Sequence, residues 1–252
     1  MLGLGEAGSI YARGLAERGA AVVAFDPVVA DTPAGVVRAS DADAAIEGAD
    51  VVLSLVGARA ADSALTSALR RMTPAAVYAD LNTGAPAQKR ELAARAAADG
   101  IPFADVAVMA PVPRAGLGTE LLASGDGASA TADRLGGLGL PIRVVGHAAG
   151  DAAGIKLLRS VFMKGLAGLV FESLDAAERI GAADEIRRQL AGELGPDGDA
   201  LVQRLLDGTR QHAARREHEM LDTRAFLEEL GTPPRMTDGT IAWLRALQAQ
   251  DS

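Results

Sequence analysis

The chain has 252 residues, 49% of them hydrophobic and 23% charged, a balance typical of folded globular protein and large enough for two packed domains. Its formal net charge of -8 repels polyphosphate, so nucleic acid is not an expected partner. The chain contains no cysteine and no apolar stretch of the roughly 20 residues that span a bilayer. We therefore expect no disulfide, no signal peptide ahead of Gly3, no membrane association and a cytoplasmic location.

Short β-branched runs alternate with Ala-rich helical stretches over the first part of the chain. The expected strands cover residues 21–25, 51–56, 75–81, 103–108 and 142–145. This alternation predicts βαβ units and a parallel sheet. The run 51–56 is almost wholly apolar, which predicts a central strand covered by helices on both faces. The fold class expected is α/β, with a Rossmann-type doubly wound parallel sheet.

Strand signals stop after Gly146, and the rest of the chain has helical periodicity. The expected helices cover residues 151–180, 183–194, 199–230 with a break near Gly208, and 238–249. We place a domain boundary near Gly150, between a dinucleotide-binding domain (1–149) and an all-α C-terminal domain (150–252) for substrate and dimerisation. The apolar stripes of these helices exceed what one small sheet domain can cover, so we expect a homodimer.

A glycine-rich turn opens the chain. The segment 3–8, GLGEAG, matches the G-x-G-x-x-G pattern, and the good helix formers of residues 9–18 follow it. Backbone N–H groups at the start of that helix are expected to face the phosphates of a dinucleotide. Only Met1 and Leu2 precede the turn, so the first strand is expected to be very short.

The next strand ends in Asp26, about 20 residues beyond the glycines, where ribose hydroxyls are recognised. A carboxylate there would repel a 2′-phosphate, and no arginine follows before Arg38. We therefore predict that NAD is preferred over NADP. The alternative is that Asp26 is only a turn residue before Pro27.

Two later segments, DLNTGAP at 80–86 and DVAVMAP at 105–111, follow the glycine turn in the order found in one enzyme superfamily. The chain resembles the 3-hydroxyisobutyrate/6-phosphogluconate dehydrogenase superfamily. The resemblance places Asn82 and Thr83 near the nicotinamide end of the cofactor. It also implies a loop that holds the substrate carboxylate with a serine and glycines. In this chain that loop is replaced by Met109-Ala110-Pro111, which resembles a little-characterised branch with a different C-terminal domain.

The segment 150–160 opens the long helix, where the superfamily carries a lysine and, four residues later, an asparagine. Lys156 matches the lysine, and Ser160 stands in place of the asparagine. A lysine held among apolar residues can accept the hydroxyl proton when a hydride leaves an alcohol, and Ser160 shares its helix face. Lys164, two turns along, is the rival base. The alternative for Lys156 is an exposed helix lysine.

The resemblance implies an NAD(P)-dependent dehydrogenase or reductase of the β-hydroxyacid dehydrogenase type. Its expected reaction is hydride transfer between a nicotinamide and a small hydroxy-acid or hydroxy-carbonyl substrate. The alternatives are an imine reductase and a dinucleotide-binding protein without turnover. No spacing of His, Asp or Glu indicates a metal site. The stripe His212, Arg215, Arg216 and Glu219 is expected to be a solvated helix face.

The candidate site residues fall into three groups. Catalytic candidates are Lys156 and Ser160. Substrate-binding candidates are Met109, Ala110, Pro111 and Lys164. Cofactor-binding candidates are Gly3, Gly5, Glu6, Ala7, Gly8, Asp26, Leu55, Val56, Asn82 and Thr83.

Overall fold

The computed structural model of the protein describes residues 1–250, with only the backbone of Gln250, and divides into two compact units. The first unit runs from Met1 to Lys156 and the second begins at Leu157. The division lies within the long helix α7 (Asp151–Arg179), whose start follows the sequence boundary at Gly150. Residues 251 and 252 of the expected second domain lie outside the described residues.

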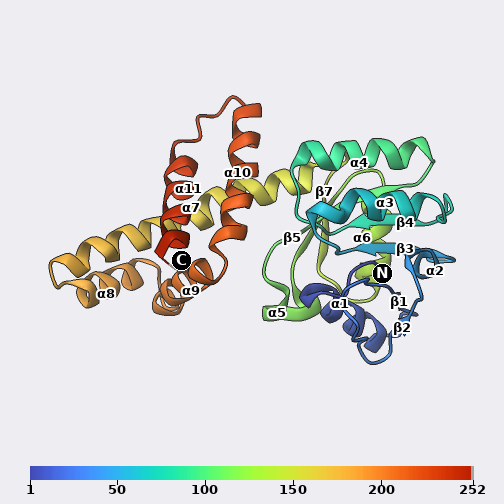
Figure 1. Ribbon diagram of the computed structural model, residues 1–252, viewed down its shortest axis with the longest axis horizontal. Coiled ribbons are helices and arrows are strands. Elements are labelled where there is room, and N and C mark those ends of the chain that lie inside the picture. Colours follow the sequence, from blue (N-terminus) through green and yellow to red (C-terminus); the bar gives the residue numbers. More distant parts are fainter. Residues whose placement is uncertain (251–252) are drawn as a thin grey trace. The chain divides into compact units, whose positions relative to one another are not determined.

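A mostly parallel sheet forms the centre of the first unit (Figure 1). Its order is β3-β4-β5-β6-β7, and the separate pair β1-β2 is joined to it through Leu2, which bridges Phe25 on one side and Ser54 on the other. The strands are β1 (Val23–Ala24), β2 (Val37–Arg38), β3 (Val51–Ser54), β4 (Val77–Asp80), β5 (Phe103–Val108), β6 (Leu121–Ser124) and β7 (Ile142–Gly146). The first strand is therefore reduced to Leu2, and the strand order is that of a Rossmann sheet. The fold class expected from the alternating pattern is confirmed.

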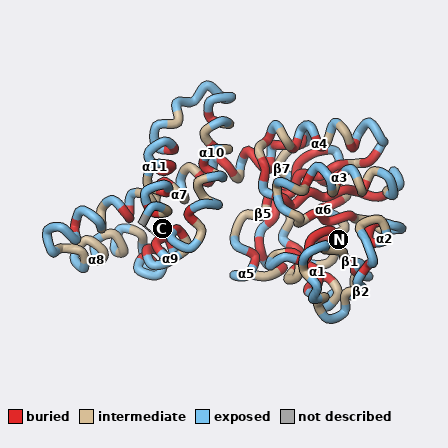
Figure 2. The backbone as a smooth tube through the Cα atoms, in the orientation of Figure 1, coloured by how far each residue is buried: buried red, intermediate tan, exposed pale blue. Residues whose placement is uncertain are grey.

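Helices cover both faces of this sheet, and β3 to β6 are largely buried, whereas β7 at the edge is partly exposed (Figure 2). One face packs against α1 (Glu6–Glu17), α5 (Val112–Ala115), the 3-10 turn η2 (Gly116–Gly118) and α6 (Ala128–Gly137). The other packs against α2 (Ala42–Ile46), α3 (Ala61–Leu69), which follows the 3-10 turn η1 (Ala58–Ala60), and α4 (Pro86–Ala98). Of β3, Val52, Leu53 and Ser54 are buried, as expected for a strand covered on both sides.

The sheet differs from the expected all-parallel one at β6, which pairs antiparallel with β5. The connection between them holds only the short α5 and η2, not the long crossover helix that parallel neighbours need. Strands β6 and β2 were not expected from the sequence because both are short, and β6 has no β-branched residue.

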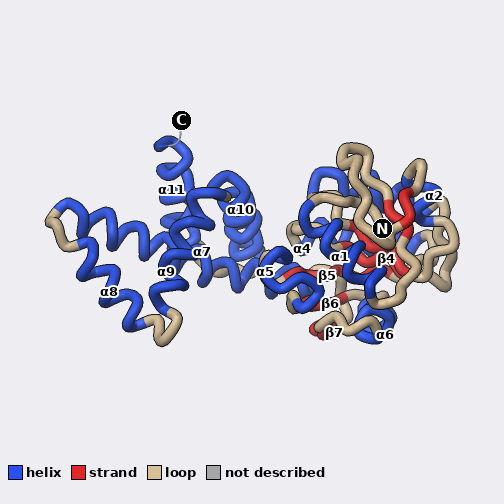
Figure 3. The backbone as a smooth tube through the Cα atoms, turned by 90° about the horizontal axis from the view of Figure 1, so that it is seen from below, coloured by secondary structure: helices blue, strands red, loops and turns tan. Residues whose placement is uncertain are grey.

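The second unit is wholly helical in the part that the structure describes (Figure 3). After α7 come α8 (Ala183–Glu193), α9 (Gly198–Gln211), α10 (Ala213–Glu229) and α11 (Arg235–Gln250). The break predicted near Gly208 is at His212, and Gly208 itself lies inside α9. An added Cβ at Gly208 would lie 3.0 Å from Nη2 of Arg216, so this glycine lies against the guanidinium.

The core of the helical unit brings together α7, α9, α10 and α11, with Phe171 stacked on Trp243 at 6.4 Å between ring centroids. Four large apolar side chains of α7 stay exposed: Ile155, Leu158, Phe162 and Leu169. The homodimer stays a prediction. None of the helices within residues 1–250 is both long and apolar enough to span a bilayer.

A buried lysine links three elements of the sheet unit. Lys89, on α4, is only 2% exposed, and its Nζ lies 2.9 Å from Oδ2 of Asp80 at the end of β4 and 3.5 Å from Oδ1 of Asp105 on β5. The same Nζ donates to the carbonyl oxygen of Asn82 at 2.7 Å. Two buried carboxylates thus share one buried cation, and the chain just beyond β4 is fixed by it.

The remaining negative charge is met by the start of α7. Oδ2 of Asp105 accepts from the backbone N–H groups of Gly150 at 3.1 Å and Ala153 at 2.9 Å. Ser124 adds a hydroxyl donor to Asp105 at 3.3 Å and accepts from Ala152 N at 3.0 Å. A carboxylate at a helix N-terminus is favoured by the unpaired N–H groups and the helix dipole. The network therefore fixes the first turn of α7 to β5 and β6.

Lys89→Met is expected to lower the free energy of unfolding by about 3–5 kcal/mol, because it leaves Asp80 and Asp105 buried without their cation. Urea unfolding at pH 7 measures the change. Arg13→Met, at an exposed position of α1 where the guanidinium makes a 3.8 Å pair with Glu17, is the control and should change it by less than about 1 kcal/mol. Equal stability of the two variants would contradict the structural role given to Lys89.

Candidate functional site

The glycine turn lies at the carboxyl end of the first strand. Gly3 has φ +96°, and an added Cβ there would lie 2.4 Å from the carbonyl oxygen of Leu55, so the turn passes close to the chain that leaves β3. An added Cβ at Gly8 would lie 2.2 Å from the carbonyl oxygen of Gly3. These two glycines let the turn close on itself and let α1 begin directly against it.

Gly5 differs from the other two glycines, because an added Cβ there would meet no atom within 4 Å. It is exposed, caps α1 at its N-terminus and is followed by exposed Glu6 and half-buried Ala7. Packing within the chain does not require a glycine at this position, whereas close approach of a pyrophosphate to the backbone does. The turn therefore fits a dinucleotide at the N-terminus of α1.

Asp26 lies beside this turn and is fixed by backbone donors. Its Oδ2 accepts from Leu4 N at 2.7 Å, and its Oδ1 accepts from the N–H groups of Val28 and Val29 at 2.8 and 2.9 Å. Burial works against the charge, but these three hydrogen bonds and the charge of Arg38 outweigh it and lower the pKa of Asp26. The carboxylate stays ionised and helps to shape the turn that it adjoins.

Arg38 reaches the same place through the sheet. Because β1 and β2 are parallel and pair Ala24 with Arg38, the side chain lies over the ring of Phe25 and donates to the carbonyl oxygens of Asp26 and Val29. Arg38 was not expected beside Asp26, because it is 12 residues further along the chain. The structure brings the two charges together beside the glycine turn.

The chain leaving β3 and the chain leaving β4 adjoin the turn at the same edge of the sheet. Leu55 and Val56 are half-buried, and Leu55 N donates to Leu2 O at 2.8 Å. Asn82 is buried, with its Oδ1 accepting from Gly57 N at 2.7 Å and its Nδ2 donating to Ser54 and Asp80. The amide of Asn82 thus ties two strand ends together and faces the protein interior.

Thr83 and Lys156 form a contact that the sequence analysis did not foresee between two of its candidates. Thr83 is exposed, and its Oγ1 accepts from Nζ of half-buried Lys156 at 3.0 Å. Both belong to the first compact unit and are positioned by the network around Lys89, which fixes the chain at Asn82 and the first turn of α7. An ammonium and a hydroxyl therefore stand together beyond the carboxyl end of β4, where open α/β sheets bind ligands.

The loop expected to meet the substrate follows β5. Met109 and Ala110 are half-buried and Pro111 is exposed. Met109 packs with Val145 against buried Ala107 and Leu122, and its N–H donates to the carbonyl of Glu120 at 3.0 Å. The loop thus presents apolar surface where the superfamily has a serine.

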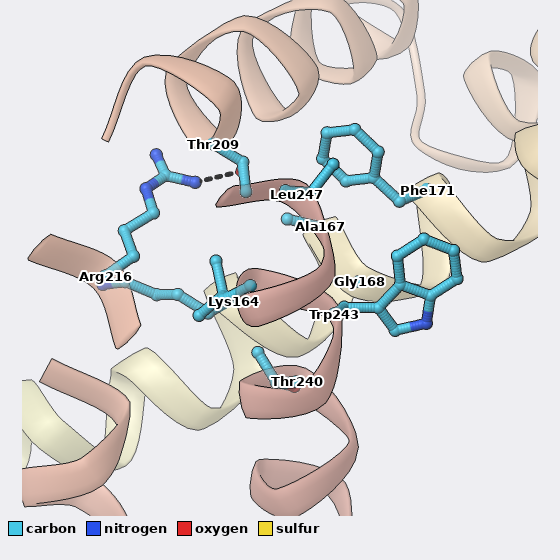
Figure 4. Close-up of a pocket in the computed structure, with 10 residues that line it drawn as sticks. Lys164, Ala167, Gly168, Phe171, Thr209, Arg216, Thr240, Trp243 and Leu247 are labelled. Atoms are coloured by element: carbon cyan, nitrogen blue, oxygen red, sulfur yellow. Dashed lines mark hydrogen bonds between the residues drawn. The ribbon is translucent and has the colours of Figure 1, made fainter. Parts of the chain in front are cut away.

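Ser160 and Lys164 lie together in the helical unit. Nζ of Lys164 donates to Ser160 Oγ at 3.0 Å and to Oε1 of Glu219 at 2.7 Å, and the Ser160 hydroxyl donates to the same Glu219 oxygen. Burial lowers the pKa of Lys164, aided by the charges of Arg216 and Arg159, and this outweighs the opposing effect of Glu219. Ser160 thus makes its polar contacts with Lys164 and Glu219, and Lys164 lines a small pocket of this unit (Figure 4).

Three residues with a part in these arrangements were not among the candidates: Lys89, Arg38 and Glu219. The sequence around Lys89 gives no sign that this helix lysine is buried. The contact of Arg38 with Asp26 spans 12 residues and depends on the register of β1 with β2. The contact of Glu219 with Lys164 spans 55 residues and depends on the pairing of two helices. Glu219 was assigned to a solvated stripe with Arg216, but both side chains are partly buried. Nowhere in residues 1–250 do three His, Cys, Asp or Glu side chains gather as they would around a metal ion.

Comparison with known families agrees with the geometry of the turn. Residues 1–134 match the model of the NAD binding domain of 6-phosphogluconate dehydrogenase. The chain belongs to this NAD-binding family. The superfamily resemblance drawn from the three motifs is confirmed. Residues 177–247, within the helical unit, match a second model described as a domain of unknown function, DUF1932, which agrees with a divergent branch.

Two relatives are similar in sequence over most of this chain or a large part of it. A conserved hypothetical protein from Sinorhizobium meliloti is 33% identical, with 97% of this chain and 86% of that one covered and a TM-score of 0.78. An uncharacterized 28.5 kDa protein from Methanothermus fervidus is 28% identical over 160 residues, which are 64% of this chain and 61% of that protein. The matched region thus spans less than two thirds of the curated relative.

More distant structures show the fold alone. They include a 3-hydroxyisobutyrate dehydrogenase from Mycobacterium tuberculosis (19% identity, 98% of this chain and 92% of that one, TM-score 0.80). An imine reductase from Myxococcus stipitatus, in complex with NAD+, is also similar (18% identity, 98% and 92% covered, TM-score 0.70). The family's NAD-binding, dehydrogenase-like fold is therefore present, in agreement with the turn at Gly3–Gly8.

Gly5→Ala and Gly8→Ala are expected to separate cofactor contact from folding. Gly5→Ala should keep the free energy of unfolding within about 1 kcal/mol, the size of a change in helix cap, and weaken NADH binding by about 10-fold or more. Gly8→Ala should lower both the free energy of unfolding and the affinity for NADH, because its Cβ would overlap the Gly3 carbonyl. Urea unfolding and calorimetric titration measure the two quantities. Normal NADH binding by Gly5→Ala would show that the phosphates lie elsewhere.

Proposed function

We propose that this protein is an NAD-dependent oxidoreductase that acts on a small hydroxy-acid or hydroxy-carbonyl compound. The observation that carries the proposal is the placement of Lys156 against Thr83, beyond the carboxyl end of β4. A bound nicotinamide cofactor would supply or accept the hydride. The chain's own part is to hold the cofactor at the turn and to move one proton.

The proton step falls to Lys156. When an alcohol is oxidised, its hydroxyl proton must leave, and in the reverse direction the carbonyl oxygen must gain one. Lys156 reaches the solvent-exposed hydroxyl of Thr83, so its Nζ stands where a substrate oxygen can replace or join that hydroxyl. In oxidation the neutral amine of Lys156 accepts the hydroxyl proton and becomes the ammonium, and in reduction the ammonium gives that proton to the carbonyl oxygen. Thr83 holds Nζ in place, and the Asp105 contacts to Gly150 and Ala153 fix the helix that carries Lys156.

Lys156 also favours alcohol or carbonyl chemistry over imine reduction, because imine reductases of this superfamily usually lack the lysine. A protein that binds a dinucleotide without turnover would leave Lys156 with no role. A panel of hydroxy acids and their keto forms, followed through NADH absorbance, identifies the substrate on which the following variants are compared.

Lys156→Ala is expected to lower kcat by roughly 100- to 10,000-fold, the usual contribution of a proton-transfer group, while the Kd for NADH changes by less than about 3-fold. Steady-state kinetics and calorimetry provide the two readouts. Lys164→Ala is the comparison, since that lysine belongs to the helical unit and pairs with Glu219. Loss of turnover in Lys164→Ala with full turnover in Lys156→Ala would show that Lys164, and not Lys156, transfers the proton.

We also propose that NAD is preferred over NADP, because the ionised carboxylate of Asp26 would repel a 2′-phosphate. Asp26→Asn should raise affinity for NADP relative to NAD by about 10-fold or more, since the repulsion goes and Arg38 stays beside the site. Adding Arg38→Gln to Asp26→Asn should remove most of that gain. Calorimetric Kd values for both cofactors test this, and tighter NADP binding by the unaltered protein would refute it.

A further inference from the structure

The chain just beyond β5 continues the alternation of that strand, in which successive side chains point to opposite faces of the sheet. Ala104 and Val106 belong to the core on the side of α1 and α6. Asp105, between them, accepts hydrogen bonds from the first turn of α7 on the other side. Met109 N–H donates to Glu120 O at 3.0 Å, which extends the ladder between β5 and β6 by one residue. Met109 therefore lies on the face of the sheet from which α7 starts.

Met109 and Lys156 lie at the same end of this face. Met109 packs against a buried cluster that includes Ala152, and Ala152 is about one helical turn before Lys156. Nζ of Lys156 donates to Oγ1 of Thr83, just beyond β4, the strand that pairs with β5. These residues all belong to the first compact unit. A substrate whose oxygen reaches Lys156 thus has the apolar side chain of Met109 at the same edge.

The segment around Met109 offers few hydrogen-bond donors to an anion. The side chains of residues 109–113, MAPVP, contain no N–H or O–H group. Of the backbone N–H groups, that of Met109 is bonded to Glu120, and the two prolines have none. Val112 is buried in the core on the side of α1. A carboxylate held here would therefore meet the N–H of Ala110 alone, whereas an ion removed from water needs several donors or a cation.

The cations around this loop do not compensate for the missing donors. Arg114 follows the loop on α5, which packs with α1 against the opposite face of the sheet. Arg143, on β7, is already paired with Glu120 at 3.2 Å. Lys156 is a neutral amine when it accepts a hydroxyl proton, so it brings no positive charge to a substrate that is about to be oxidised. The surroundings of Met109 in the sheet unit thus favour an uncharged group.

We infer that Met109 determines specificity and that the preferred substrate is an uncharged aliphatic hydroxy-carbonyl compound, such as a hydroxy ester, instead of a hydroxy acid. The inference rests on the oxidoreductase activity proposed above and narrows its substrate class. In oxidation the alcohol carbon gives its hydride to NAD+ and the hydroxyl gives its proton to Nζ of Lys156, so the products are the keto compound and NADH. The aliphatic part of the substrate lies against Met109, whose flexible side chain fits alkyl groups of different shape.

Matched pairs of substrates test the inference on the full chain. The compounds are 3-hydroxybutyrate, 3-hydroxyhexanoate and 3-hydroxyoctanoate, each compared with its methyl ester, and NADH absorbance gives the initial rates with NAD+. We expect kcat/KM to be about 10-fold or more higher for the esters, because a carboxylate beside Met109 would lose water without gaining a partner. Oxidation of the acids with equal or higher kcat/KM would overturn the inference and leave the oxidoreductase activity intact. Oxidation of none of the six compounds would refute both.

Variants of Met109 test whether this residue sets the preference. Met109→Lys keeps an unbranched side chain and adds a cation, so it should lower the ester-to-acid ratio of kcat/KM by about 10-fold or more. Met109→Leu stays apolar at similar volume and should keep that ratio within about 3-fold, even where the rate changes. Met109→Ser is the second polar variant should Met109→Lys lose the native circular dichroism spectrum. A ratio unchanged in the folded polar variant, or changed as much by Arg114→Gln, would overturn the role of Met109.

Discussion

The buried ion network around Lys89 is the constraint on which the rest of the sheet unit depends. One cation on α4 lies between Asp80 and Asp105, and the surplus negative charge is met by the N–H groups that begin α7. Charged groups at this depth are stable only when each has its partner, so the ends of β4 and β5 and the start of α7 hold one mutual arrangement. Thr83 and Lys156 come together as a consequence.

The same reasoning separates two kinds of polar residue at the carboxyl edge of the sheet. Asn82 and Asp105 form hydrogen bonds with other groups of the protein, and these bonds fix the loops that follow the strands. Thr83, Gly5 and Glu6 are exposed and leave surface for a ligand. A site built in this way has rigid support beneath a small exposed layer, which suits the positioning of a cofactor and of one proton-transfer group. The helical unit carries its own polar cluster around Lys164, with a separate set of partners.

Much of the fold could be predicted from the sequence, because local signals were strong. The glycine turn, the apolar run at β3 and the long periodic stretch of α7 each determine their element through short-range physics. The antiparallel β6 and the turn at His212 could not be predicted in the same way. β6 has four residues and no β-branched one, and Gly208, the better helix breaker by residue type, lies inside α9.

Only those residues of the candidate site that belong to a recognisable sequence motif could be predicted. Thr83 and Lys156 came from the superfamily resemblance, but their contact spans 73 residues and follows from the packing of α7 on the sheet. Arg38 and Lys89 had no local signal, since a cation at an ordinary position in a strand or helix is usually solvated. Their places depend on the register of β1 with β2 and on the burial of α4.

Amide hydrogen exchange of the full chain, with and without saturating NADH, tests the central claim most directly, because it observes the backbone N–H groups that are held to bind the phosphates. The account predicts slower exchange in a peptide that covers the turn at Gly3–Gly8 and the first turns of α1, with a smaller change around Leu55 and Thr83. Unchanged exchange at the turn, at NADH concentrations that saturate a calorimetric titration, would contradict it.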